Sequence, residues 1–91
     1  MTSAITHDRV GHKFTTTVDG HEGYVDYSTG DGRIVITHTV VPAEIGGRGI
    51  AAELVKAALD FARSEGLKVV PECSYAAGYL QKHPEYASLI A

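Results

Sequence analysis

Residues 38–51, HTVVPAEIGGRGIA, constrain the fold more than any other part of the chain. This stretch leaves a β-branched run, passes a proline, crosses three glycines and enters a long helical pattern. Glycine permits positive φ and a close approach of the backbone to a ligand. The first N–H groups of a helix have no intrahelical partners, and the helix dipole adds partial positive charge there. The order of strand, glycine-rich turn and helix therefore predicts an anion site for a phosphate or pyrophosphate.

Two expected strands precede this stretch as a hairpin. Apolar residues and threonines alternate over residues 12–18, as in a half-buried strand. Asp19-Gly20 is a strong two-residue turn signal, and the return strand is expected over residues 21–27. Residues 1–10 show no clear period, so we expect a loose lead-in.

A third strand is expected over residues 33–41, after a turn at residues 28–32. Regular alternation places four side chains on one face of this strand: Ile34, Ile36, His38 and Val40. The other face is also largely apolar or β-branched, so we expect a central strand covered on both sides. The three strands then form an antiparallel meander.

A helix is expected over residues 50–65, where apolar residues recur at helical spacing and Gly66 supplies the C-terminal stop. The short apolar run at residues 67–70 predicts a fourth strand, parallel to the third. The connection through the helix is then a right-handed βαβ unit.

A second helix is expected over residues 73–83, and Pro84 ends it. Residues 84–90 are expected to add a last short helical turn. The predicted fold class is therefore α/β (α+β): an antiparallel three-stranded meander plus a parallel fourth strand, with helices packed on the sheet. We expect one domain over residues 1–91, because the chain is short and has no internal linker.

Composition excludes several classes of function. The net charge is −3 with no basic run, which argues against nucleic acid as a partner and suits a cationic one such as an amine. The single cysteine allows no intramolecular disulfide and fits a reducing compartment. No apolar run approaches the length of a membrane span, and residues 1–10 lack a secretory apolar core. We therefore expect a cytoplasmic protein with no membrane partner.

The glycine loop fits neither of two common phosphate-binding motifs. No Gly-Lys-Ser/Thr follows the glycines, which excludes a Walker loop, and three antiparallel strands precede them, which does not fit a dinucleotide-binding βαβ unit. The run VPAEIGGRGIAAELV instead resembles the acyl-CoA-binding segment of the GCN5-related N-acetyltransferases. Their pattern is Arg/Gln-x-x-Gly-x-Gly/Ala, which falls here on GGRGIA. Gly46 stands where the superfamily usually has Arg or Gln.

The resemblance extends from Phe14 to the C-terminus. The runs THTVVPAEIGGRGIAAELV and ARSEGLKVVPECSYAAGYLQKHPEY look like those of the small single-domain members of that superfamily. This likeness implies a minimal acetyltransferase fold that binds acetyl-CoA and transfers an acetyl group to a primary amine, directly or through a cysteine. The implied pyrophosphate cradle is the loop and first helical turn: Gly46, Gly47, Arg48, Gly49, Ile50 and Ala51. The Arg48 side chain is either a phosphate contact or a solvated loop residue.

The resemblance also implies roles at the ends of the third and fourth strands. A backbone N–H at Val40 or Val41, with Val41 preferred, would bind the thioester carbonyl, on which negative charge develops when the amine attacks. Cys73 would begin the second helix close to the thioester. It is a candidate nucleophile, a candidate proton donor to the leaving CoA thiolate, or a small buried residue at a helix start.

Further candidates lie on the second helix and the third strand. Tyr75 and Tyr79 share one helix face, and either is a candidate general acid or a core side chain. Lys82 and His83 end the helix and either suit its dipole or reach the CoA phosphates. His38 is either a core histidine or a general base for the amine. The five histidines show no ligand spacing with the cysteine, so no metal site is expected.

Two other classes of function stay open at this stage. The chain has no counterpart of the N-terminal helices that build a substrate wall in larger members of the superfamily, which fits a non-catalytic CoA or acyl-CoA sensor. The departure at Gly46 fits an interaction module that has lost the ligand. The acetyl acceptor (small molecule, peptide or protein lysine) and the choice between monomer and homodimer are not determined by the sequence.

Overall fold

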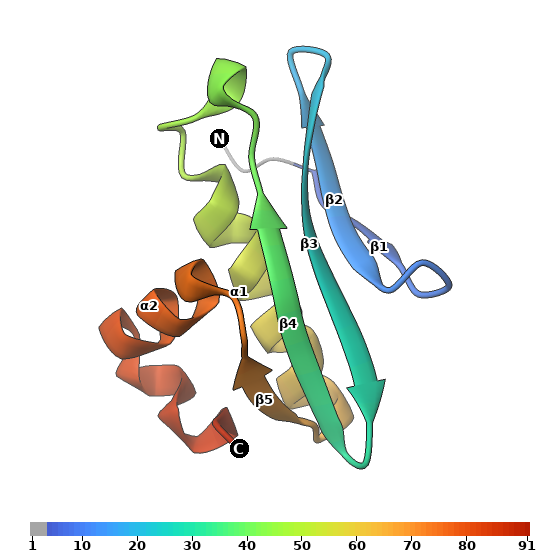
Figure 1. Ribbon diagram of the computed structural model, residues 1–91, viewed down its shortest axis with the longest axis vertical. Helices are drawn as coiled ribbons and strands as arrows, with labels where there is room; N and C mark the ends of the chain where they lie inside the picture. Colours follow the sequence, from blue (N-terminus) through green and yellow to red (C-terminus); the bar gives the residue numbers. More distant parts are fainter. Residues whose placement is uncertain (1–3) are drawn as a thin grey trace.

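The computed structural model describes residues 4–91 and shows a five-stranded mixed sheet in the order β1-β2-β3-β4-β5 (Figure 1). Strands β1 to β4 pair antiparallel, and β5 pairs parallel with β4. Helix α1 lies behind the sheet, while α2 and the C-terminus lie beside β5. The elements are β1 (Thr6–Asp8), β2 (Lys13–Val18), β3 (His21–Gly30), β4 (Arg33–Val40), α1 (Ile50–Glu65), β5 (Lys68–Pro71) and α2 (Ser74–Lys82), with short 3-10 helices over Ala43–Ile45 and Pro84–Leu89.

The predicted α+β architecture is confirmed, including the meander of β2, β3 and β4 and the parallel strand β5. Helix α1 begins at Ile50 and ends at Glu65, as its periodicity predicts, and Gly66 closes it with φ of 69°. The apolar face of α1 meets one face of the sheet. The largest fully buried side chains come from both layers: Val25, Ile34, Ile36, Ile45, Leu54, Val55, Leu59 and Val69.

The turn between β3 and β4 is tighter than expected, whereas the Asp19-Gly20 turn has the predicted length. The predicted turn over residues 28–32 is wrong at its start, because β3 continues to Gly30 and only Asp31-Gly32 connects it to β4. Asp31 and Gly32 have φ of 54° and 74°, and Asp19-Gly20 has 50° and 78°. Two successive residues with positive φ give the turn whose twist matches that of the flanking strands.

A short strand occupies part of the expected lead-in, so the prediction for residues 1–10 is wrong at Thr6–Asp8. This strand, β1, pairs with β2, with Asp8 opposite Lys13. Three residues are too few to show a period, and the partner strand decides their conformation. Residues 1–3, also expected to be loose, lie outside the described residues.

A bulge in β4 overturns the predicted faces of that strand. Tyr27 pairs with Ile36, but the preceding Asp26 pairs with His38, so Thr37 is an extra residue in β4. One extra residue moves every following side chain to the opposite face. Ile36 is fully buried, while His38 is exposed and lies on the other face of the sheet.

The second face of the sheet is open, contrary to the expected cover on both sides. No helix of residues 4–91 lies over the front of β3 and β4 in Figure 1. Val40 is 39% exposed there, and Val35 is half-buried. The β-branched residues of β4 therefore reflect strand propensity as well as burial.

No helix among residues 4–91 is long and apolar enough to cross a membrane.

An aromatic cluster attaches β1 to the core. The His7 ring stacks on Phe14 at 4.0 Å and meets the edge of Phe61 at 4.5 Å. His7 Nε2 and Tyr27 Oη lie 2.6 Å apart as a hydrogen bond. Burial lowers the pKa of His7 below its usual value, and the Arg9 guanidinium lowers it further. Folding therefore favours the neutral ring.

We expect stability to fall with acidification in a manner that depends on His7. Because the folded protein lowers the pKa of His7, its contribution is complete above the unfolded value of about 6.5 and is lost as pH falls through the folded value. The measurement is chemical denaturation of the wild type and His7→Gln from about pH 8 to about pH 5. The difference between them should shrink toward low pH, and a constant difference would contradict the assignment.

Candidate functional site

Some backbone donors of the glycine loop before α1 have no hydrogen-bond partner among residues 4–91. Gly47 and Gly49 both have φ of 76°, and a β-carbon at either position would meet nothing within 4 Å. Gly49 is the N-cap of α1 and supplies no side-chain cap. The Glu53 N–H donates to the Gly49 carbonyl at 3.1 Å, so the amides ahead of Glu53 have no intrahelical acceptor. Open space, unpaired donors and the positive end of the helix dipole fit a phosphate group.

Gly46 is held in an ordinary conformation. Its φ is −67°, and its N–H donates to the Ala43 carbonyl at 3.1 Å, closing the 3-10 helix that precedes the loop. A β-carbon there would lie 3.4 Å from the Ala43 oxygen, an ordinary contact. The loop geometry therefore requires glycine at position 49 but not at position 46.

The Arg48 side chain points to the β2–β3 turn. Its Nη1 lies 2.6 Å from Asp19 Oδ2, and both side chains are largely exposed. This ion pair links the glycine loop to the hairpin. An incoming anion would compete with Asp19 for the same guanidinium.

Strands β4 and β5 separate beyond Ile36. Their register ends at Ile36 opposite Pro71, and the chain then leaves β5 toward α2. The N–H groups of Glu72 and Cys73 both donate to the Ile36 carbonyl, at 3.0 and 3.1 Å. Past this point no strand of the described part of the chain pairs with the β5-facing edge of β4. Val40 and Val41, the predicted thioester-binding positions, lie at the end of this edge, and Val41 packs against the core.

Cys73 lies where the two strands separate. Cys73 is the N-cap residue of α2, and its Sγ accepts a hydrogen bond from the Ala76 N–H at 3.3 Å. Thr39 Oγ1 lies 3.2 Å from the same sulfur, and the pair forms a hydrogen bond in which either atom can donate. Thr39 was not predicted as a site residue. The bulge turns it to the side of Val25 and Cys73, and no local sequence signal marks a bulge.

A cavity of about 290 Å³ lies between α1 and α2. Seven residues line it: Ala52, Ser74, Tyr75, Gly78, Tyr79, Lys82 and His83. The two tyrosines, the lysine and the histidine are site residues predicted from the sequence. The Tyr79 ring stacks on His83 at 3.9 Å, and burial raises the pKa of Tyr79. Tyr75 is 42% exposed. The cavity thus joins the first turn of α1 to the phenols of Tyr75 and Tyr79 and to the Lys82 and His83 side chains at the C-terminal end of α2.

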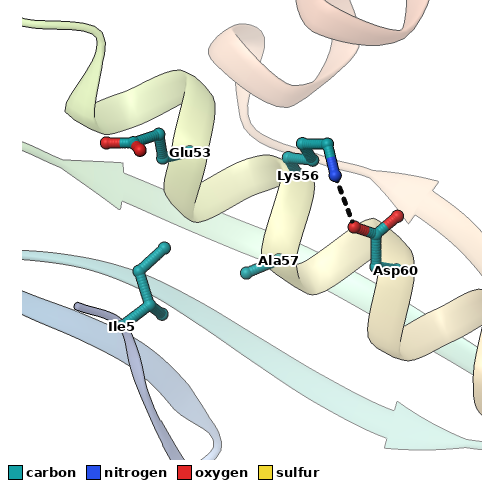
Figure 2. Close-up of a pocket in the computed structure, with 5 residues that line it drawn as sticks. All are labelled: Ile5, Glu53, Lys56, Ala57 and Asp60. Atoms are coloured by element: carbon teal, nitrogen blue, oxygen red, sulfur yellow. Dashed lines mark hydrogen bonds and ion pairs between the residues drawn. The ribbon is translucent and has the colours of Figure 1, made fainter. Parts of the chain in front are cut away.

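A second cavity, of about 330 Å³, flanks α1 on the side of Ile5 (Figure 2). Glu53, Lys56 and Asp60 of the helix are among the residues that line it, and Lys56 Nζ lies 2.8 Å from Asp60 Oδ2. None of the predicted site residues lines this cavity.

His38 lies on the open face of the sheet with Val40, away from Cys73 and the cavity between α1 and α2. Its Nδ1 lies 4.0 Å from Asp26 Oδ2 and 3.1 Å from Thr37 Oγ1. The core position considered for it is wrong, because the Thr37 bulge turns the ring outward. Cys73 and His38 therefore flank the separation of β4 and β5 from opposite sides of the sheet.

The sequence pattern described as GCN5-related N-acetyl-transferase matches residues 13–89. The chain belongs to this N-acetyltransferase family. Protein NATD1 of Gallus gallus is 42% identical over 83 residues, covering 88% of this chain and 76% of that protein. Protein NATD1 of Homo sapiens is 42% identical over 83 residues, covering 88% and 74%. The NMR solution structure of a GCN5-like protein from Staphylococcus aureus matches with a TM-score of 0.76 at 30% identity, covering 97% of this chain and 87% of that one.

Membership of the GCN5-related N-acetyltransferase family confirms the resemblance found in the sequence, and the solved structure confirms the fold. The match begins at residue 13, at the start of β2, and so leaves β1 outside it. It includes the glycine loop, Cys73 and α2. Gly46 departs from the first position of the family motif in a backbone conformation that a side chain can adopt.

We expect Gly49→Ala to destabilise the protein and Gly46→Ala to be tolerated. A side chain at φ of 76° costs about 1 kcal/mol or more, whereas at φ of −67° the same change is neutral or stabilising by about 0.4–1 kcal/mol. Thermal unfolding should show a Tm lowered by about 4–8 °C for Gly49→Ala. Equal Tm values for the two variants would contradict the conformational assignment of the loop.

Proposed function

We propose that this protein is an N-acetyltransferase that uses acetyl-CoA as donor and a primary amine as acceptor. The observation that carries this proposal is the uncapped N-terminus of α1, which opens onto the cavity between α1 and α2. Ala52 belongs to the first turn of α1 and also lines that cavity, so one ligand can contact the free amides and the cavity together. Family membership supports the choice of an acyl-CoA as that ligand.

The donor would bind along three parts of the site. The amides of residues 47–51 would hold the pyrophosphate, with Arg48 as an added charge. Lys82 and His83 would attract further phosphate oxygens at the end of α2. The Val41 N–H, or that of Val40, would donate to the thioester carbonyl oxygen beside the separation of β4 and β5.

Acetyl-CoA supplies a carbonyl carbon activated by a thiolate leaving group. The amine nitrogen attacks this carbon, the C–S bond breaks, the nitrogen gives up one proton to solvent, and the departing CoA sulfur takes a proton. In the direct route the proton for CoA comes from Tyr75, Tyr79 or Cys73. In the alternative route Cys73 Sγ attacks first and CoA leaves with the thiol proton; the amine then attacks the S-acetylated cysteine, and the Cys73 sulfur takes a proton as the acetyl group leaves it. Burial raises the pKa of Tyr79, so its phenol carries the proton near neutral pH and releases it less readily than a free tyrosine.

Two variants of Cys73 separate its structural role as the cap of α2 from its proposed role in the reaction. Its sulfur caps α2, so Cys73→Ala should cost about 1 kcal/mol of stability, whereas Cys73→Ser preserves a cap. If Cys73 is the nucleophile or the proton donor, both variants lose about 10²-fold or more in kcat while Cys73→Ser keeps the wild-type Tm; unchanged turnover would remove Cys73 from the chemistry and leave direct transfer with a tyrosine donor. The measurements are thermal shift with CoA, intact mass after incubation with acetyl-CoA, and CoA release with a panel of amines.

The outcomes separate the candidate functions. A CoA-dependent Tm shift, turnover, and an acetyl adduct that maps to Cys73 would support the covalent route. Binding and turnover without an adduct would support direct transfer. Binding without turnover on a broad panel of amines and peptides would overturn the enzyme in favour of a CoA sensor. No Tm shift at saturating CoA would overturn donor binding itself, in favour of an interaction module.

Asp19→Asn should tighten CoA binding several-fold. Loss of the ion pair frees Arg48 for the phosphates, while loss of an exposed pair changes stability by only about 0–1 kcal/mol. Asp31→Asn is the matched control, because Asp31 occupies the same place in the other two-residue turn, with φ of 54° against 50°. Isothermal titration calorimetry of both variants provides the comparison. Equal affinities would show that Arg48 does not contact the ligand.

A further inference from the structure

We infer that Thr37, the extra residue of the β4 bulge, fixes the tautomer of His38 so that Nε2 faces the open side of the sheet as a proton acceptor. Its use for the acceptor amine rests on the function proposed above. Thr37 is a positioning residue in this arrangement, because it acts through His38.

The bulge brings three groups together on the open face. Because Thr37 is the extra residue, His38 lies opposite Asp26 in the register. His38 Nδ1 lies 3.1 Å from Thr37 Oγ1 and 4.0 Å from Asp26 Oδ2. Thr37 Oγ1 also lies 3.2 Å from the Asp26 backbone carbonyl oxygen. The hydroxyl therefore stands between the imidazole and the neighbouring strand.

The hydrogen-bond chemistry decides which ring nitrogen carries the proton. A carbonyl oxygen only accepts, so the Thr37 hydroxyl donates its single proton to Asp26. Its lone pair then accepts a hydrogen bond from His38 Nδ1–H. The Asp26 carboxylate, on the same side of the ring, also favours a proton on Nδ1. In the neutral ring Nε2 is thus left with its lone pair.

The His38 side chain is 69% exposed, and the described residues place no hydrogen-bond partner at Nε2. A primary ammonium that arrives on the open face can therefore transfer one proton to Nε2, which leaves an amine with a lone pair for attack. The resulting imidazolium keeps its Nδ1–H bond to Thr37, gains attraction from Asp26, and later returns its proton to solvent.

The surrounding charges favour a cationic acceptor. Asp26 on β3 is the charged group opposite His38. Beyond it, Lys13 on β2 pairs with Asp26 in the register, and its Nζ lies 5.9 Å from the centre of the Tyr24 ring. On the β5 side, Glu72 follows the last paired residue of the strand. The Asp26 carboxylate beside His38 thus attracts a cationic amine to the open face of the sheet.

The test is the tautomer of His38, read from long-range ¹H–¹⁵N correlations of the imidazole rings. We expect Nδ1–H in the wild type, loss of this preference in Thr37→Val, and its return in Thr37→Ser. Valine preserves the β-branch that suits a strand, and serine restores the hydroxyl. His21, which lies on another strand, serves as an internal reference ring. A wild-type proton on Nε2, or an unchanged tautomer in Thr37→Val, would overturn the inference.

Kinetics then test the use of this nitrogen. Thr37→Val should lower kcat/KM for the amine by about 10-fold or more and change the pH dependence of kcat/KM, while the Kd for CoA stays the same. Thr37→Ser should restore the wild-type kcat/KM and its pH dependence. Unchanged kinetics beside a changed tautomer would overturn the role in amine deprotonation. If the wild type had no transferase activity, the proposed function would fail, whereas the NMR result would still decide the role of Thr37.

Discussion

The extra residue in β4 is the constraint on which the candidate site depends. Without Thr37 as a bulge, strict alternation would turn His38 inward beside Ile36 and turn Thr39 out to the open face. With it, Thr39 contacts the Cys73 sulfur on the helix side, and the imidazole lies opposite Asp26 on the open side. One inserted residue thereby places the Cys73 thiol and the His38 imidazole on opposite faces of the sheet, near the point where β4 and β5 separate.

The separation of β4 from β5 has a local cause in the sequence. Pro71 cannot donate to a ladder, and the next two N–H groups both converge on the Ile36 carbonyl, which turns the chain away from β4. Helix α2 begins immediately afterwards, with Cys73 as its cap. The Cys73 sulfur is therefore positioned by the same few residues that end the parallel pairing.

Sequence reasoning succeeded where a local signal specifies the structure. The spacing of apolar residues defined α1, Gly66 defined its end, and Asp19-Gly20 defined the first hairpin. It failed where pairing between strands decides the outcome. The three residues of β1 are ordered by β2 and the aromatic cluster, and the bulge at Thr37 exists only relative to β3. The positive φ of Gly49 at the start of α1 follows from a local signal, whereas the Thr39–Cys73 contact and the exposure of His38 do not.

The double role of Cys73 links the proposed chemistry to the stability of α2. As a thiol, Sγ accepts the Ala76 N–H and contacts the Thr39 hydroxyl. An acetyl group on this sulfur would delocalise its lone pairs into the carbonyl and add bulk between β4 and α2, so both contacts would weaken. The same helix carries Tyr75 and Tyr79 into the cavity. A covalent intermediate would therefore loosen the start of the helix that presents the candidate acids, whereas direct transfer would leave the cap intact throughout the reaction.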